Sequence, residues 1–247
     1  ENAQTIQFIA NCPDCSSELV KEEGGAQHYC LNEKKCLPQV KGKIEHFISR
    51  RAMNIDGLGA ETIDALVEVG FIRNIADLYS LSYEQVISMD RMADKSVRNL
   101  LDGLEASKGM PFEKALFGLG IRFVGETVSK KLAKAFLTID AIIAASYEEL
   151  VDTDEIGEKI ALSISEYFQD EDHIVLIEQL KTVGLCFEKE DEGLDSEVLA
   201  GLSIVISGTF NQFSREEIKK MIEMNGGKNV SSISKKTSIL VAGENMG

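Results

Sequence analysis

The chain contains no tryptophan, three prolines and three histidines among its 247 residues, and aromatic residues make up only 6% of it. Proteins that bind single-stranded nucleic acids stack the bases on aromatic side chains, so this scarcity argues against that mode of binding. The chain also lacks a run of about eighteen apolar residues, which a membrane-spanning helix requires, and no secretory signal opens it. We therefore expect a cytoplasmic, mostly helical protein with no membrane partner.

The charge is strongly unbalanced: 41 acidic residues against 26 basic ones give a net charge of -15. Because counterion release rewards basic surfaces, this charge taken alone argues against a nucleic-acid partner. Any binding of DNA must therefore depend on local groups. The length is sufficient for about two or three domains.

Four of the five cysteines follow the spacing C-x2-C-x14-C-x5-C, namely Cys12, Cys15, Cys30 and Cys36. Two residues between the first pair let one turn aim both sulfurs at one point, and the later pair completes a tetrahedron. This spacing predicts a zinc site that is structural, since four thiolates leave no position for water. Two disulfides are the alternative, and a site using His28 is a further one, although His28 lies only two positions from Cys30. The fifth cysteine lies in an apolar stretch, and we expect it to be buried.

The middle of the chain, residues 45–187, repeats a unit of about 32 to 34 residues. Each unit consists of a short helical pattern, a four-residue hairpin and a second helix that opens with polar residues. The third residue of each hairpin is apolar and is expected to pack between the two helices. The hairpins are residues 56–59, 90–93, 122–125 and 154–157, and their apolar residues are Leu58, Met92, Val124 and Ile156.

This pattern is typical of the helix-hairpin-helix motif, which binds DNA phosphates without reading the base sequence. A hairpin glycine permits positive φ and lets a phosphate approach the amides at the N-terminus of the second helix. The second unit fits least well because Ala93 replaces the glycine. The alternative is a helical scaffold whose glycines only cap helices. The candidate DNA contacts are Gly57, Gly59, Gly125 and Gly157, with the basic residues Arg91, Lys95, Arg122 and Lys130 beside the second and third hairpins.

A different architecture follows a charged stretch that begins at residue 188. Residues 202–208 are predicted to form a buried strand, Ser214 to cap a helix, and residues 228–232 and 238–242 to form two more strands. This βαββ order predicts a parallel α/β domain, incomplete at residue 247 because a fourth strand is missing. Residues 207–209 fit either a phosphate cradle or a plain turn between strand and helix.

Several local sequences resemble those of one family, the bacterial NAD-dependent DNA ligases. The chain is similar to the C-terminal half of these enzymes at Cys-Pro-Asp-Cys (12–15) and at Leu-Gly-Ile-Arg-Phe-Val-Gly-Glu-Thr (119–127), which adds Gly120 to the candidate DNA contacts. Residues 199–202 and 207–210, with glycines at 226 and 227, resemble a BRCT domain. The expected architecture is mainly α: a small four-cysteine zinc finger (1–44), four helix-hairpin-helix repeats (45–187), an acidic linker (188–198) and a partial, α/β BRCT domain (199–247).

The resemblance implies an enzyme that seals nicks in duplex DNA during replication and repair, through an adenylated lysine and an adenylated 5′ phosphate. NAD donates the AMP, and Mg²⁺ assists. The 247 residues contain no K-x-D-G motif for the adenylated lysine, so we expect this chain alone to be inactive and to hold nicked double-stranded DNA for upstream adenylation and OB domains. The resemblance further implies a monomer associated with the bacterial nucleoid. The alternatives are a DNA-binding module of another repair or replication factor, and a helical adaptor that binds proteins.

Overall fold

The computed structural model describes residues 8–21, 24–189, 193 and 196–244, which fall into two compact units that meet between residues 189 and 190. This boundary lies inside the segment 188–198, which the sequence predicts to be a linker. Residues 190–192 and 194–195 of that segment lie outside the described residues.

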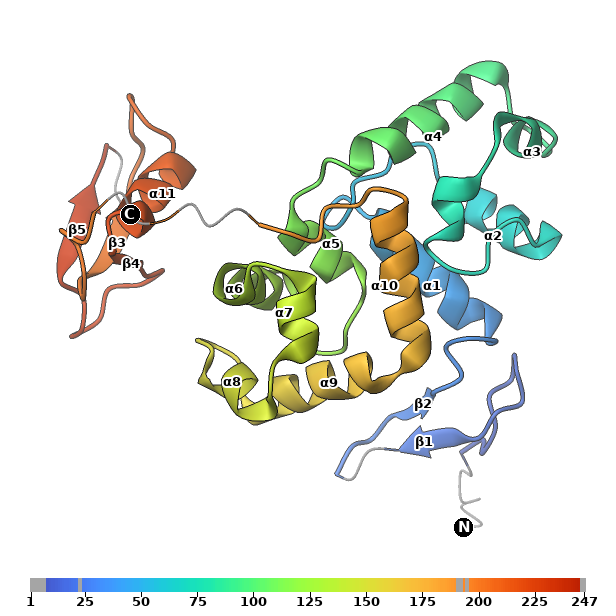
Figure 1. The fold of residues 1–247 in the computed structure, drawn as a ribbon, viewed down its shortest axis with the longest axis horizontal. Coiled ribbons are helices and arrows are strands. Elements are labelled where there is room, and N and C mark those ends of the chain that lie inside the picture. The colour runs from blue at the N-terminus through green and yellow to red at the C-terminus, as the bar shows by residue number, and fades with distance from the viewer. Residues whose placement is uncertain (1–7, 22–23, 190–192, 194–195, 245–247) are drawn as a thin grey trace, which may run out of the picture. The chain divides into compact units, whose positions relative to one another are not determined.

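The first unit begins with a small two-stranded sheet, blue in Figure 1. Strand β1 (Leu19–Lys21) pairs antiparallel with β2 (His28–Cys30), and Leu19 lies opposite Cys30. Helix α1 (Leu37–Ile48) is the next element, with Cys36 as its N-cap residue and a proline in its first turn. The fourth cysteine therefore connects this small sheet to the helical part of the chain. We call residues 1–44, which the sequence predicts to be a zinc finger, the finger.

The predicted fourfold repeat is confirmed, because each hairpin lies between a leading helix and a second helix. The second helices begin one residue after the small residue that ends each hairpin. The leading helices are α1, α3 (Tyr83–Ile87), α5 (Phe112–Gly118) and α8 (Tyr147–Asp152), and the second helices are α2 (Ala60–Val69), α4 (Asp94–Ser107), α6 (Glu126–Phe136) and α9 (Glu158–Gln169).

The short helix η1 (Asp77–Ser80) links the first and second units, and α7 (Ile139–Ala144) links the third and fourth. Helix α10 (Glu171–Thr182) follows α9 directly (Figure 1). Ser82 and Ser146 form capping boxes that start α3 and α8. No helix in the described ranges is long and apolar enough to cross a bilayer.

The apolar residues of the hairpins pack between their helices as expected. Leu58, Val124 and Ile156 are buried, and Met92 is partly buried against the same core. Removal of such side chains from water supplies about 25 cal/mol per Å² of apolar surface, which stabilises short helices that would not persist alone. This core extends through all four units.

The third and fourth hairpins also form contacts with helices of each other's repeats. In the third hairpin the carbonyl oxygen of Arg122 accepts a 2.7 Å hydrogen bond from Oγ of Ser163 on α9. In return, Nζ of Lys131 on α6 lies 2.7 Å from a carboxylate oxygen of Asp154 in the fourth hairpin. The third and fourth units therefore fix each other's hairpins in place.

The second of the two compact units, which begins after Lys189, contains a three-stranded parallel sheet. This sheet confirms the predicted βαββ order. Strand β3 (Ser203–Ser207) lies between β4 (Lys228–Asn229) and β5 (Ile239–Ala242), and α11 (Arg215–Met224) connects β3 to β4. A Cβ on Gly208, after β3, would lie 2.7 Å from the carbonyl oxygen of Glu244. This close approach explains the glycine and favours the plain turn over a phosphate cradle.

Candidate metal centre and nucleic-acid interface

The sulfur atoms of four cysteines all lie within 4.8 Å of one another; they belong to Cys12, Cys15, Cys30 and Cys36. The sulfurs of Cys12 and Cys36 are 3.8 Å apart, and those of Cys15 and Cys30 are 3.5 Å apart. A disulfide would require about 2.05 Å, whereas four sulfurs at about 2.3 Å from a zinc ion lie about 3.8 Å from one another. The two-disulfide alternative is therefore wrong, and the donor set fits a tetrahedral zinc ion. His28 lies outside the cluster and stacks on Phe8.

The surroundings shift the pKa values of Cys15 and Cys36 in opposite directions before any metal binds. Hydrogen bonds from Ser17 lower the pKa of Cys15 to about 6, whereas burial raises the pKa of Cys36 to about 12. Zinc binds thiolates, so it displaces these protons, and its binding free energy contributes to folding. Cys186 differs from the expectation of a buried residue. It is only partly buried, and its thiol donates a hydrogen bond to the carbonyl oxygen of Glu188 at 3.1 Å.

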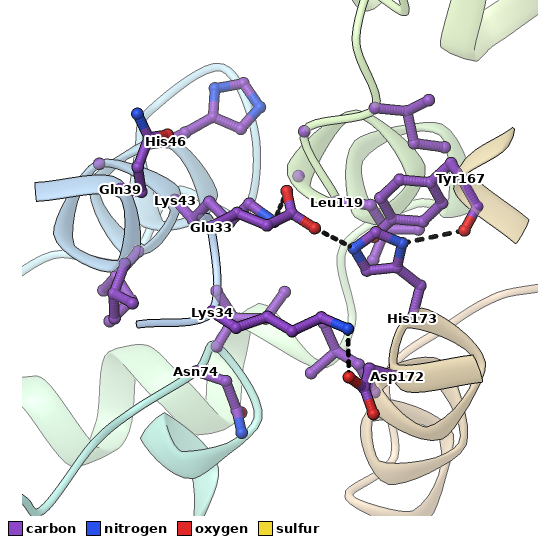
Figure 2. A pocket seen from close by; sticks show the side chains of 18 of the residues that line it. Glu33, Lys34, Gln39, Lys43, His46, Asn74, Leu119, Tyr167, Asp172 and His173 are labelled. Atoms are coloured by element: carbon purple, nitrogen blue, oxygen red, sulfur yellow. Dashed lines mark hydrogen bonds and ion pairs between the residues drawn. The ribbon is translucent and has the colours of Figure 1, made fainter. Parts of the chain in front are cut away.

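A buried histidine joins the finger to α10, as Figure 2 shows. Nε2 of His173 lies 2.8 Å from Oε1 of Glu33, which stands between the third and fourth cysteines. Nδ1 of His173 lies 2.9 Å from the carbonyl oxygen of Tyr167, and the two rings stack with centroids 3.8 Å apart. The hydrogen bond from His173, with further help from Lys43, lowers the pKa of Glu33 to about 2. The carboxylate of Glu33 is therefore ionised at neutral pH.

A second contact in the same place involves Lys34, which forms ion pairs with Asp170 and Asp172 at the start of α10. Glu33, His173 and Lys34 together form what we call the finger clasp. No sequence pattern pointed to it, because about 140 residues separate its two sides. Since most of these groups are charged and paired, the clasp fixes the finger on the helical repeats.

The clasp borders a cavity of about 770 Å³ between the finger loop, α1, the turn after α5, and α10 (Figure 2). Gly120 is the single predicted DNA contact that lines it. Of its polar side chains, His46 lies 2.8 Å from the carbonyl oxygen of Phe117 through Nε2, and Glu33, Lys43 and His173 are paired with one another. The cavity reaches the third hairpin at Val124, and the described residues that line it form no catalytic constellation.

The residues that end the hairpins, Gly59, Ala93, Gly125 and Gly157, are the N-cap residues of the second helices. All four are extended, with φ between -99° and -83°, and none provides a side-chain cap. By contrast, a serine, threonine or aspartate side chain caps α3, α7, α8, α10 and α11. The second helices thus present first-turn N–H groups that no capping side chain of their own satisfies.

Gly59, Gly125 and Gly157 do not use the positive φ that glycine permits, because their backbones are extended. Positive φ occurs two residues earlier, at Gly57, Arg91, Phe123 and Glu155. Because the N-cap position is extended, alanine fits there without strain, and the second unit keeps the geometry of the others. A Cβ added to Gly59, Gly125 or Gly157 would meet no described atom within 4 Å. The described part of the chain therefore offers no packing reason for glycine at these three positions.

Gly57 and Gly120 are different, because positive φ accounts for both glycines and close packing adds a second reason at Gly57. Gly57 has φ +89°, and a Cβ there would lie 3.3 Å from Cα of Leu100 on α4. Gly120 has φ +70° just after α5, and a Cβ there would lie 3.6 Å from the ring of His46. Both stay predicted DNA contacts through their backbones, but their lack of a side chain needs no ligand to explain it.

The predicted basic contacts lie on the surface. Arg91, Lys95 and Lys130 are exposed, and the guanidinium of Arg122 lies 5.0 Å from the centroid of the Tyr29 ring in the finger. Acidic residues also open the four second helices: Glu61, Asp94, Glu126 and Glu158. Two of these acids are neutralised locally, since Lys114 pairs with Glu126 and Arg98 with Asp94.

Four protein-family models match the chain in succession. The matches are the NAD-dependent DNA ligase C4 zinc finger domain at residues 11–37, a SAM-like helix-hairpin-helix tandem at 49–106, a helix-hairpin-helix motif at 114–177, and a BRCA1 C Terminus (BRCT) domain at 195–247. The zinc finger match agrees with the clustered sulfurs and supports a structural zinc ion.

Relatives named DNA ligase match almost the whole chain. The DNA ligase of Phocaeicola vulgatus is 54% identical over 98% of the chain, that of Bacteroides fragilis is 54% identical over 99%, and that of Christiangramia forsetii is 54% identical over 100%. The chain spans 37% of the length of each of these relatives.

Proposed function

Since the chain belongs to the NAD-dependent DNA ligase family, we propose that it is the part of such an enzyme that holds duplex DNA around a nick. In the whole enzyme, domains beyond these 247 residues transfer AMP from NAD, with Mg²⁺, and seal the nick. The chain itself lacks the K-x-D-G motif for an adenylated lysine and contributes binding rather than catalytic residues.

One observation carries this proposal: three second helices begin at glycines that have extended backbones and open space where a side chain would stand. A helix N-terminus favours an anion through its N–H groups and its dipole. A phosphate oxygen replaces the missing capping side chain at Gly59, Gly125 and Gly157. Because the donors are neutral amides, an acidic chain can bind DNA in this way.

The basic residues Arg91, Lys95, Arg122 and Lys130, beside the second and third hairpins, add contacts to the phosphates. The backbones of Gly57, in the first hairpin, and Gly120, just before the third, complete the proposed set. Such contacts carry no base information, so the binding is independent of sequence.

The four clustered cysteines hold the zinc ion in this proposal, and the finger supports the third hairpin through Tyr29 and Arg122. We retain the division into finger (1–44), repeats (45–187), linker (188–198) and BRCT segment (199–247). A monomeric state and an association with the bacterial nucleoid belong to the same proposal.

The test replaces Gly59, Gly125 and Gly157 together by serine and measures affinity for a nicked duplex by fluorescence anisotropy. The serine hydroxyls cap the helices and compete with phosphates for the same N–H groups. We expect the dissociation constant to rise by at least about tenfold, with unchanged or higher thermal stability. Gly109→Ser, in the turn after α4, is the matched control.

Unchanged affinity of the triple variant would show that the hairpin amides do not hold DNA and would favour the adaptor alternative. A DNA-binding module of another repair factor would give the same binding result as a ligase. The full-length protein distinguishes these two, because only a ligase seals a nicked duplex in the presence of NAD.

A further inference from the structure

The tip of the third hairpin carries an exposed aromatic residue in a disfavoured backbone conformation. Phe123 has φ +65°, and 42% of its surface is exposed. A bulky L-residue in the left-handed region is rare, and it persists only where surrounding contacts impose it. The corresponding residues of the other hairpins carry no aromatic ring: they are Gly57, Arg91 and Glu155.

The contacts that hold Phe123 are clear. The carbonyl group of the preceding Arg122 is fixed by the hydrogen bond from Ser163. The guanidinium of Arg122 lies 4.9 Å from the centroid of the Phe123 ring, and the ammonium group of Lys159 lies 4.3 Å from it. These two cations orient the ring while leaving nearly half of the residue open to solvent.

The finger takes part in this arrangement. The same guanidinium of Arg122 lies 5.0 Å from the centroid of the Tyr29 ring on β2. Tyr29 is itself 37% exposed. Two aromatic rings and two cations therefore form one surface, contributed by the finger, the third hairpin and α9. We call Tyr29, Arg122, Phe123 and Lys159 the hairpin-tip cluster.

The cluster lies between two helix N-termini that the proposed function assigns to phosphates. Helix α6 begins three residues after Phe123, and Lys159 belongs to the first turn of α9. In the proposed complex, the ring lies between two phosphate positions and faces the sugars and base edges of the groove that these phosphates border. Apolar side chains in such positions wedge between base steps and partly unstack them.

We propose that Phe123 is a wedge that contacts the interrupted base step of a nicked duplex and makes the chain prefer nicked over intact DNA. Unstacking an intact step costs free energy, and a break in one strand lowers that cost because the backbone no longer restrains both bases. The inference rests on the proposed function, since it needs the hairpins to hold a duplex. It adds a residue that selects the substrate.

The experiment uses the full 247-residue chain with zinc and two duplexes of the same sequence, one intact and one nicked. Phe123→Ala removes the ring. Phe123→Gly also relaxes the backbone, and the first hairpin shows that glycine fits this position. Tyr147→Ala, which removes an aromatic residue that is 40% exposed elsewhere in the repeats, is the matched control. A 2-aminopurine beside the nick reports unstacking by an increase in fluorescence.

We expect the wild type and Tyr147→Ala to bind the nicked duplex at least about threefold more tightly than the intact one. Both Phe123 variants should reduce that ratio to below about 1.5 and lose the fluorescence increase, while their affinity for the intact duplex changes little. An equal loss of affinity for both duplexes, no loss at all, or a wild type without preference overturns the wedge but leaves duplex binding intact. A wild type that binds neither duplex refutes the proposed function itself.

Discussion

Nε2 of His173 on α10 lies 2.8 Å from Oε1 of Glu33 in the finger. The other ring nitrogen faces the carbonyl oxygen of Tyr167, which can only accept a hydrogen bond. Glu33 is ionised, because its pKa lies at about 2. Both ring nitrogens of His173 therefore face acceptor oxygens. A hydrogen bond to an ionised carboxylate thus connects two segments that are distant in the sequence.

We predict that His173→Ala lowers the free energy of unfolding by about 1–3 kcal/mol, because a charged hydrogen bond to a partly buried carboxylate is lost. Urea denaturation at neutral pH measures it. Glu178→Ala, which removes an exposed carboxylate from the same helix, is the control. Equal stabilities of the two variants would contradict a structural role for the clasp.

The clasp also predicts a pH dependence. The pKa of Glu33 is lowered from 4.5 to about 2 by the hydrogen bond from His173, so its contribution to stability is complete above about pH 4.5 and is lost as the pH falls toward 2. The difference in stability between wild type and Glu33→Gln should shrink over this window. Because both proteins have the same zinc ligands, the comparison separates Glu33 from acid release of the metal. A difference that stays constant to pH 2 would exclude the clasp as its source.

The zinc site predicts close to one equivalent of zinc per chain in elemental analysis. Cys36→Ser should retain less than about a fifth of an equivalent and lose stability, because three thiolates no longer close the tetrahedron. Cys186→Ser should keep the full amount, since its sulfur lies outside the cluster. A folded finger with no metal under reducing conditions would refute the zinc assignment.

Two glycines of the first hairpin should respond in opposite directions. Gly57→Ala should lower stability by about 1–2 kcal/mol, since alanine is disfavoured at φ +89° and its Cβ would press on the backbone of Leu100. Gly59→Ser should raise stability by a few tenths of a kcal/mol. Its φ and ψ of -93° and 167° closely match those of Ser82, which caps α3. Thermal denaturation of both variants decides whether the two positions differ as described.

The salt dependence of DNA binding should separate charged from neutral contacts. Lys95→Ala and Lys130→Ala should each reduce the slope of log K against log salt by about 0.9, because one phosphate contact is lost. Gly125→Val should weaken binding with a smaller change in slope, since neutral amides release fewer counterions. It should also lower stability by no more than about 1 kcal/mol, the cost of a poorer N-cap residue, because φ is -85° and a Cβ there meets no described atom within 4 Å. Identical slopes for the wild type and both lysine variants would remove these residues from the interface.

The chain alone should form no covalent adenylate when incubated with radiolabelled NAD and Mg²⁺, because it lacks the K-x-D-G motif. Gel electrophoresis shows the outcome directly. A full-length relative that adenylates itself under the same conditions serves as the positive control. A labelled band from the 247-residue chain would reveal an active site that its sequence motifs do not predict.

The sequence by itself determined the features that depend on local spacing. Four cysteines at fixed intervals have few ways to share one metal ion, and the separations of Cys12 from Cys15 and of Cys30 from Cys36 predict the cluster. The fourfold repeat and the capping boxes at Ser82 and Ser146 likewise follow from residues a few positions apart.

Tertiary structure alone decided where these local units meet and which backbone positions are strained. The glycines predicted the positions of the hairpins correctly. In the third hairpin, however, positive φ occurs at Phe123 and not at Gly125, because the chain reverses direction before the extended N-cap residue from which α6 begins. The pairs Glu33 with His173 and Tyr29 with Arg122 join segments separated by scores of residues. Such contacts depend on how the whole core packs, and no local pattern of residue types encodes them.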